Sequence, residues 1–365
     1  MEIRVPRSEF VGELAPMQGI VERKTTIPIL SHLLLTARGD KLHLAATDLD
    51  VSLTSVCEAD VRQEGGIAVQ AKKLMEIVRS LGGDEVHLVQ EEPRVLTIKA
   101  GRSRFKIHGL PPDDFPTLPV VEDSQQVEIP FASFRRMVSK ILFAVSAEES
   151  RFQLNGALLK LKDGGLELVA TDGHRLALVE TSLSDGGGND SVLVPRKALQ
   201  ELQRIEGDGS LAYRRGEHHL SFRLGRRELI CRILEGTFPD YERVIAKDND
   251  KKVLFDRKPL SEAVQRVALL TGDRARAVRL QFGGEQLVIT AANPDLGEAM
   301  EELACAYDGP EFRLGINPDY LIQFLGAVDT DRIRLELKDE NTQCVGYPVE
   351  GPDARYLCVI MPMRI

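Results

Sequence analysis

The sequence repeats itself three times, and this repetition constrains the fold more than any other feature. A strand-turn-strand pattern reads LHLAATDLDVSLT, LELVATDGHRLALV and LVITAANPDLGEAM in the three copies. Thr47, Thr171 and Asn293 occupy matching positions in it, so the copies are 124 and 122 residues apart. Similarity by chance is the alternative for any single marker, but further markers keep the same period and order.

Two helical segments recur in each copy. The first reads VPRSEFVGELAPM, IPFASFRRMVSKILFAV and DRKPLSEAVQRVALL, and the second reads VQAKKLMEIVRSL, VPRKALQELQRI and INPDYLIQFLGAV. In the middle copy of the first segment, the apolar residues fall on one helical face: Phe134, Met137, Val138, Ile141, Leu142 and Val145. Arg135, Arg136 and Lys140 lie away from that stripe. Pro195 and Pro318 are expected in the first turn of the second helices.

The repeats predict three tandem α+β domains, each with the order helix, strands, helix, strands. A closing segment, GRSRFKIHGLPPDDFPTL, returns as GRRELICRILEGTFPDYERV, with Phe115 and Phe238 separated by 123 residues. Polar connectors follow both copies. We therefore expect domains at residues 1–121, 122–247 and 248–365.

The composition excludes several classes of protein. The formal net charge is −9, so a polyanion would have to bind a locally positive surface on an acidic body. The five cysteines include no CxxC pair, which disfavours a disulfide framework or a zinc site and favours a reducing compartment. MEIRVPRSEF lacks the apolar core of a signal peptide, and the longest apolar run, 27–37, is too short to cross a bilayer. These features predict a cytoplasmic protein.

Motifs for catalysis are missing from the sequence. It contains no GxxxxGK[ST], HExxH or GxSxG. Asp113 and Asp114 stand in a proline-rich loop and favour an exposed turn over a carboxylate pair. Asp172 and His174 leave a hydrolase open as an alternative, although no serine stands out as a nucleophile. We expect no catalytic residue, no cofactor and no metal ion.

Positive side chains gather on or near the helical segments. In the first two repeats they are Lys24, Lys72, Lys73, Arg79, Arg135, Arg136, Lys140, Arg196, Lys197 and Arg204. For one helix, the polar side of an amphipathic helix is the simpler interpretation. Because five of the six helices share the bias, we predict a common basic surface that contacts phosphates without reading bases.

Helix dimensions suggest how such a surface could enclose DNA. Six helices with axes about 8–10 Å apart close a circle of about 15–19 Å, which leaves almost no hole once a helix diameter of about 10–12 Å is removed. Twelve helices from two chains leave an opening of about 20–28 Å. A dimer could therefore encircle a duplex, whereas one chain could not.

The sequence also resembles the bacterial DNA polymerase sliding clamp family, the beta subunits of the replicative polymerase. The likeness extends over the whole chain and rests on KTTIPILSHLLL, AGRSRF, DDFPTLP, VATDGHRLAL, VPRKAL, GTFPDYERV and VIMPMRI. The resemblance implies a processivity factor without catalysis, a head-to-tail homodimeric ring with helices inside and sheets outside. It also implies duplex DNA bound irrespective of sequence, with a clamp loader, replicative and translesion polymerases, ligase and mismatch-repair proteins as partners.

Two protein-binding surfaces follow from the resemblance. The dimer interface would contain Lys73, Arg102, Arg104, Phe105, Ile107, Leu269, Leu270, Glu301 and Glu302. A pocket for short partner peptides, between the second and third domains, would contain Leu154, Thr171, Gly173, His174, Arg175, Leu176, Pro239, Arg243, Val244, Tyr320, Val359, Met361, Pro362, Met363 and Arg364. Methionines would give it an adaptable apolar lining, and arginines would hold polar groups at its rim. A last edge strand buried in the third core is another interpretation of the tail.

The sequence departs from the family pattern at a few positions. Gln153 replaces an aromatic residue of some members, and acidic Glu148 and Glu149 flank it, which weakens a DNA or peptide role for that loop. Lys24 replaces an arginine and loses its bidentate fork, so we expect a phosphate contact there. A monomeric peptide-binding adaptor of the same fold remains an alternative to the ring.

Overall fold

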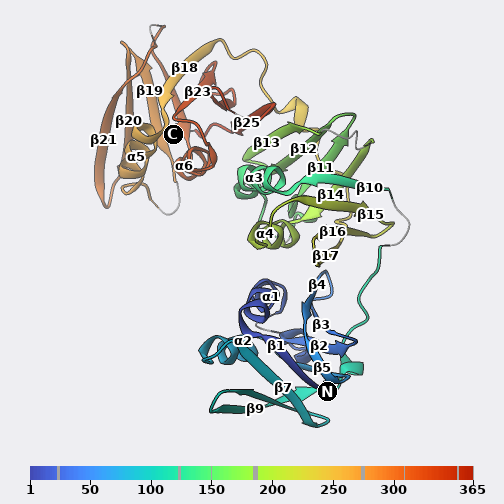
Figure 1. Cartoon of the computed structure of the whole chain (residues 1–365). Helices are drawn as coiled ribbons and strands as arrows, with labels where there is room; N and C mark the ends of the chain where they lie inside the picture. The colour runs from blue at the N-terminus through green and yellow to red at the C-terminus, as the bar shows by residue number, and fades with distance from the viewer. Residues whose placement is uncertain are drawn as a thin grey trace. The chain divides into compact units, whose positions relative to one another are not determined.

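The computed structural model describes residues 1–22, 25–121, 125–148, 150–183, 188–272, 276–307, 309–351 and 353–364. Figure 1 shows the elements along the chain, coloured from the N-terminus to the C-terminus. The contacts within the chain divide it into two compact units. Unit 1 contains residues 1–132 and 197–233, and unit 2 contains residues 133–196 and 234–365. The division passes through the predicted middle repeat, so the limits of the three sequence repeats stay a prediction.

The helices form where the periodicity predicts them. In the described residues they are α1 (Arg7–Ile20), α2 (Ala71–Ser80), α3 (Phe131–Ile141), α4 (Arg196–Arg204), α5 (Arg257–Ala268) and α6 (Pro318–Ala327). Pro318 opens α6 as predicted, and Asn317 caps it by accepting a bond from the backbone N–H of Asp319. Pro195 ends the preceding strand instead, one residue before α4, so its expected place in the helix was wrong.

Helix α3 confirms most of the predicted apolar stripe. Phe134, Met137, Val138 and Ile141 are fully buried. The α-helix ends at Ile141 and continues as the short 3₁₀ helix η3 (Leu142–Ala144), which leaves Leu142 only partly buried. The tighter turn rotates Leu142 out of the stripe because a 3₁₀ helix advances by three residues per turn.

Unit 1 is built on one antiparallel sheet with a core beneath its alternating apolar residues. The strands run in the order β10 (Gln126–Pro130), β15 (Ser210–Arg215), β16 (His219–Leu224), β17 (Arg227–Arg232), β4 (Val51–Glu58), β3 (Lys41–Thr47), β2 (His32–Arg38), β6 (Gly65–Gln70), β9 (Ser103–Leu110), β8 (Val95–Ala100), β7 (Glu85–Glu92), β1 (Glu2–Pro6) and β5 (Asp60–Gln63). Short 3₁₀ turns lie at η1 (Pro28–Ser31) and η2 (Pro112–Asp114).

Unit 2 contains two antiparallel sheets. The larger has the order β14 (Asp190–Pro195), β11 (Gly156–Lys162), β12 (Gly165–Thr171), β13 (Arg175–Ser182), β25 (Arg355–Ile360), β24 (Cys344–Pro348), β23 (Arg332–Leu337) and β18 (Lys251–Asp256). The smaller has the order β21 (Gly297–Ala304), β20 (Gln286–Asn293), β19 (Val278–Gly283) and β22 (Phe312–Ile316). The 3₁₀ turns η4 (Phe152–Leu154) and η5 (Tyr241–Arg243) complete the unit.

The three strand-turn-strand markers are three hairpins. They correspond to the pairs β3–β4, β12–β13 and β20–β21, each joined by a three-residue turn at 48–50, 172–174 and 294–296. The repeated pattern thus reports a repeated local structure, and the predicted strands are confirmed.

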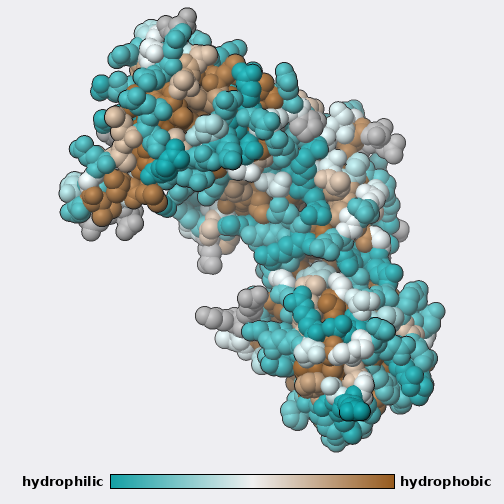
Figure 2. Space-filling model, turned by 60° about the vertical axis from the view of Figure 1, so that its left-hand side comes forward, coloured by the Kyte–Doolittle hydropathy of each residue, from teal (hydrophilic) through white to brown (hydrophobic). Residues whose placement is uncertain are grey.

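Exposed large apolar side chains are few. Among the described residues they are Ile27, Leu49, Phe105, Val120, Phe152, Leu269, Leu296 and Met300. On the face drawn in Figure 2, apolar side chains form separate patches between polar ones. No helix in the described part of the chain is long and apolar enough to cross a membrane.

Candidate functional site

The C-terminal tail is tied to strand β13 by backbone hydrogen bonds. β25 pairs with β13, so that Leu176 lies opposite Val359. Beyond β25, the Met361 N–H donates to the His174 carbonyl at 2.9 Å, and the Met363 N–H donates to the Gly315 carbonyl at 2.7 Å. Because β25 also pairs with β24, it is an interior strand, and the alternative of a last edge strand was wrong.

The turn between β12 and β13 is organised by two side chains. Thr171 Oγ1 donates to the Arg175 carbonyl at 2.6 Å and accepts from the Gly173 N–H at 3.1 Å. Asp172 Oδ1 accepts from the backbone N–H groups of His174 and Arg175. Gly173 has φ of 90°, and a Cβ there would lie 2.8 Å from the Arg151 guanidinium. The TDG sequence therefore specifies the turn.

This geometry disfavours the hydrolase alternative. The Asp172 carboxylate is bonded to two backbone amides and, at 3.0 Å, to Nε of Arg175. A catalytic dyad needs the carboxylate to orient the imidazole of His174. The Asp172 carboxylate instead bonds to the backbone of the turn and to Arg175.

Arg175 is stacked between aromatic rings and is no free rim group. Its guanidinium carbon lies 4.4 Å from the ring centre of Tyr320 and 5.3 Å from that of Phe143. It also donates to Asp172 and to Gln323. These contacts enclose nine-tenths of the side chain, and the expectation that Arg175 holds a ligand's polar groups at the rim stays a prediction. Phe143 and Gln323 lie in helical segments that recur in the repeats, but the sequence did not predict their contact with Arg175.

The residues of the predicted pocket divide into a buried group and an accessible group. Leu154, Leu176 and Val359 are buried, and the last two belong to a core cluster against which Val244 packs. Burial raises the pKa of the neighbouring Tyr320 hydroxyl. Members with exposed surface, besides the largely enclosed Arg175, are Gly173, His174, Pro239, Arg243, Val244, Tyr320, Met361, Pro362, Met363 and Arg364. The buried group can support a binding surface, and the accessible group can contact a ligand.

The last residues of the tail border a cavity. Met363 and Arg364 line a cavity of about 460 Å³ together with Arg279, Arg313 and Glu340. The remaining predicted pocket residues do not line it. Arg243 is highly exposed and pairs with Asp240 at 2.7 Å. Phe152 is 68% exposed and directly precedes Gln153, the position where some family members have an aromatic residue. Phe152 was not identified from the sequence as an aromatic residue in this loop.

The basic residues differ in how accessible they are. Lys72, Lys73 and Arg79 are exposed on α2, and the Lys73 hydrogen bond lowers the pKa of Glu76. Arg135 is exposed on α3, and Arg204 is exposed on α4. These five side chains are exposed to solvent, and their contact with DNA stays a prediction.

Lys140 was wrongly predicted to face DNA. Its side chain is only 1% exposed, and Nζ lies 2.7 Å from both Asp353 and Asp329. Arg136, partly buried, lies 2.9 Å from Asp353. The acidic partners come from distant segments and draw the lysine inward, so it cannot meet a phosphate.

Three further members of the basic set have mixed environments. Arg196 is partly buried, and its Nε is enclosed without a hydrogen-bond partner in the structure. Lys197 donates to the Ile20 carbonyl and to Asp48. Lys24, like Glu149, lies outside the described residues.

Most of the predicted dimer residues lie on or beside two strand edges, whereas Lys73 lies on α2. Strand β9 pairs with β8 along its length but with β6 only at its end, which leaves 103–108 unpaired on one side in the described structure. Phe105 is 37% exposed there, Arg102 is exposed and Ile107 is partly buried. Arg104 lies 2.9 Å from Glu91.

The second edge is strand β21, which pairs only with β20 in the described residues. Glu301 is bonded to Arg266 on α5, and this bond lowers the pKa of the carboxyl. Glu302 is exposed, Leu269 is 77% exposed and Leu270 is partly buried. Open edges of this length invite pairing with another strand.

Among the described residues, no group of three or more His, Cys, Asp or Glu side chains could hold a metal ion. The five cysteines are all buried and reduced.

Comparison with known proteins identifies the family. The sequence matches the N-terminal, central and C-terminal domains of the DNA polymerase III beta subunit over residues 1–119, 128–240 and 242–364. It is 38% identical to the beta sliding clamp of Pseudomonas aeruginosa and 33% identical to that of Escherichia coli K12, in each case over the full length of both chains.

Solved structures agree with the sequence matches. The crystal structure of the Pseudomonas aeruginosa DNA polymerase III beta subunit superposes with a TM-score of 0.93 at 37% identity and covers all of both chains. A clamp from the same organism bound to griselimycin gives a TM-score of 0.94 at 37% identity over all of both chains. By its three consecutive domains and its full-length relatives, the chain belongs to the DNA polymerase III beta subunit family, the beta sliding clamps.

Proposed function

We propose that this protein is a DNA sliding clamp, a processivity factor that encircles duplex DNA and has no catalytic activity of its own. The observation that carries the proposal is the match to beta sliding clamps along the entire chain. A topological link to DNA requires no tight contact, so weak attraction to phosphates would hold the ring near the duplex and let it slide.

The DNA-facing surface would consist of the accessible basic side chains. They are Lys72, Lys73, Arg79, Arg135 and Arg204, all exposed. Lys73 and Arg204 each have a carboxylate within hydrogen-bond distance on the same helix, so their attraction to DNA would be moderated. The net charge of −9 disfavours binding of DNA elsewhere on the protein.

Two copies of the chain would close the ring head to tail. The edge of β9 carries positive Arg104 and Lys106, and the edge of β21 carries negative Glu298 and Glu302. Pairing these edges would remove both unpaired edges and bury Phe105 against Leu269. A head-to-tail contact of this kind closes only if the same pairing occurs twice.

The partners would bind through short peptides at the accessible tail surface around Met361, Pro362 and Met363. The clamp from Pseudomonas aeruginosa that binds griselimycin supports ligand binding in this family. We expect a clamp loader, replicative and translesion polymerases, ligase and mismatch-repair proteins to share the surface. Their work on DNA would place the protein in the cytoplasm, where its five buried thiols stay reduced.

Retention on DNA tests the ring. The protein, loaded with a clamp loader and ATP onto nicked circular DNA, is expected to stay bound through gel filtration and to leave when the circle is cut. Leu269→Asp places a charge at an exposed interface position and should abolish retention and shift light scattering from dimer to monomer. Retention on cut DNA, or a monomeric parent protein at micromolar concentration, would contradict the proposal and favour the monomeric adaptor.

Truncation tests the peptide surface. Removal of 361–365 should weaken binding of a fluorescent polymerase-tail peptide at least about tenfold, because the removed residues supply the adaptable apolar contacts. Thermal melting controls for the two tail backbone bonds lost with them. Unchanged affinity in a folded truncation would refute this location.

A further inference from the structure

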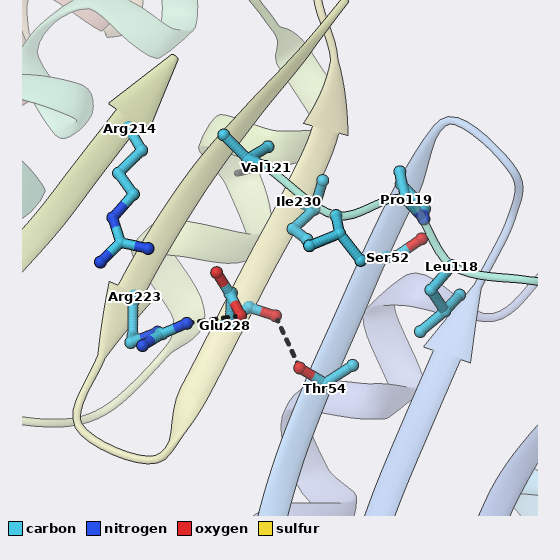
Figure 3. Close-up of a pocket in the computed structure, with 10 residues that line it drawn as sticks. Ser52, Thr54, Leu118, Pro119, Val121, Arg214, Arg223, Glu228 and Ile230 are labelled. Carbon is cyan, nitrogen blue, oxygen red and sulfur yellow. Dashed lines mark hydrogen bonds and ion pairs between the residues drawn. The ribbon is translucent and has the colours of Figure 1, made fainter. Parts of the chain in front are cut away.

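A cavity in unit 1 lies against the outer face of its sheet, where segment 118–121 passes over the strands (Figure 3). Its volume is about 450 Å³. The lining residues are Ser52, Thr54, Leu118, Pro119, Val120, Val121, Arg214, Arg223, Glu228 and Ile230. The DNA surface, dimer edges and tail surface proposed above use none of these residues.

Two rows of side chains on neighbouring strands form the floor of the cavity. One row crosses four strands through Arg214, Ser221, Ile230 and Ser52. Side chains two residues apart share a face, so the next row, which includes Arg223, Glu228 and Thr54, faces the same way. The opposite face buries Tyr213, Phe222, Leu229 and Leu53 in the core. The floor is therefore held rigidly from behind.

The internal repeat relates this cavity to the core cluster beside the tail. Ser52 and Thr54 stand 124 residues before Leu176 and Leu178, and Val121 stands 123 residues before Val244. The strand pairing agrees, since Ser52 lies opposite Ile230 and Leu176 lies opposite Val359. In both the cavity and the core cluster, the segment that follows a repeat, with Val121 or Val244, therefore packs against a sheet face.

The equivalent positions differ in size and polarity. In unit 2 they are leucines and valines, and the apolar cluster fills the space. In unit 1 serine and threonine replace two of the leucines, and smaller side chains leave a cavity. Ile230 and Val121 remain as apolar walls, 7% exposed each, and Val120 is 72% exposed at the cavity.

Charge decides what this cavity can accept. Arg214 donates through Nε and Nη2 to the neutral amide oxygen of Gln126. Arg223 lies 3.1 Å from Glu228, whose carboxylate also accepts from Ser221. Among the described lining residues, two guanidinium groups face one carboxylate, which leaves a positive charge beside an apolar wall. An extended peptide that alternates leucine with aspartate matches it, because alternate side chains point to opposite sides.

We propose that this cavity is a second peptide-docking site, which binds short extended segments with alternating apolar and acidic side chains. The choice of a peptide rests in part on the proposed function of the tail surface, through the repeat that relates the two places. The leucines would contact Leu118, Val121 and Ile230, and the acids would reach Arg214 and Arg223. A partner with two such segments could then hold one chain at two points.

The test uses the intact protein and an acetylated, amidated hexapeptide of alternating leucine and aspartate. Titration calorimetry gives the number of sites, and a dye at Val120→Cys reports on this cavity alone. Burial raises the pKa of all five native thiols, so maleimide labelling should favour position 120. We expect the peptide to change the dye fluorescence, and a peptide of leucine and lysine to leave it unchanged.

Variants separate the two sites. The double variant R214E/R223E should weaken the dye response at least about tenfold, whereas Arg214→Lys, which keeps the charge, should retain most of it. Removal of 361–365 should leave the response intact even if the tail surface binds nothing, so the two proposals can fail separately. Circular dichroism confirms folding of each variant. Absence of a response in the parent, or a response that survives R214E/R223E, overturns the inference.

Discussion

The buried charge cluster around Lys140 gives the sharpest prediction about stability. Lys140 and Asp353 are each 1% exposed, with 2.7 Å between Nζ and the carboxylate. Asp329 contacts the same ammonium group, Nζ lies 4.7 Å from the Tyr356 ring centre, and the Tyr356 hydroxyl donates to the Lys140 carbonyl. Lys140→Ala would remove the cation and leave Asp353 with Arg136, its other basic partner among the residues that the structure describes.

The magnitude follows from the burial of the partner left behind. Loss of one member of a buried ion pair costs about 3–5 kcal/mol, because the other charge stays desolvated. For a unit of this size, 1 kcal/mol lowers the melting temperature by about 2–4 °C, so the unit 2 transition should fall by about 6–20 °C. Differential scanning calorimetry would resolve this transition.

A matched control and a second substitution sharpen the result. Lys258→Ala removes an exposed helical lysine that lies 3.9 Å from Glu262, and should change stability by less than about 0.5 kcal/mol. The double variant K140M/D353N should be more stable than Lys140→Ala, because it also removes the buried carboxylate that has lost its lysine partner. If Lys140→Ala melts together with Lys258→Ala, the reasoning about the buried pair is refuted.

Three further predictions concern other buried groups. Burial raises the pKa of Glu201, so the stability it contributes is present below its ordinary pKa and is lost as the pH rises through the folded value. Glu201→Gln should therefore raise the melting temperature at pH 7 by about 2 °C, with the gap closing near pH 4; an equal gap at both would count against this. Tyr241→Phe removes a hydrogen bond to the buried Glu167 carboxylate and should cost about 1.5–3 kcal/mol in urea unfolding, while an unchanged midpoint would argue against a desolvated bond. Burial raises the pKa of the Cys57 and Cys344 thiols to about 12, so native protein at pH 8 should react with a thiol reagent far more slowly than the five thiols of unfolded protein.

The sequence determined the repeated architecture, because the relevant signals are local. Helical periodicity located all six described helices, and the motif around Thr47, Thr171 and Asn293 located three hairpins. The turn at Gly173 was also readable, since Asp172 and Thr171 bond to backbone groups within four residues. Such contacts form between residues close together in the chain, so a short sequence motif is enough to predict them.

Only the tertiary structure decided which of the predicted site residues are accessible. The position of Lys140 on its helix predicts an exposed cation. In the structure it is buried against the carboxylate of Asp353, which is 213 residues away in the sequence. Arg175 likewise stacks on Tyr320, which is distant in the sequence. Ser52 lines a cavity together with Ile230 because strand β4 pairs with β17. Burial and ion pairing depend on which distant segments the fold brings together, and helix periodicity carries no information about them.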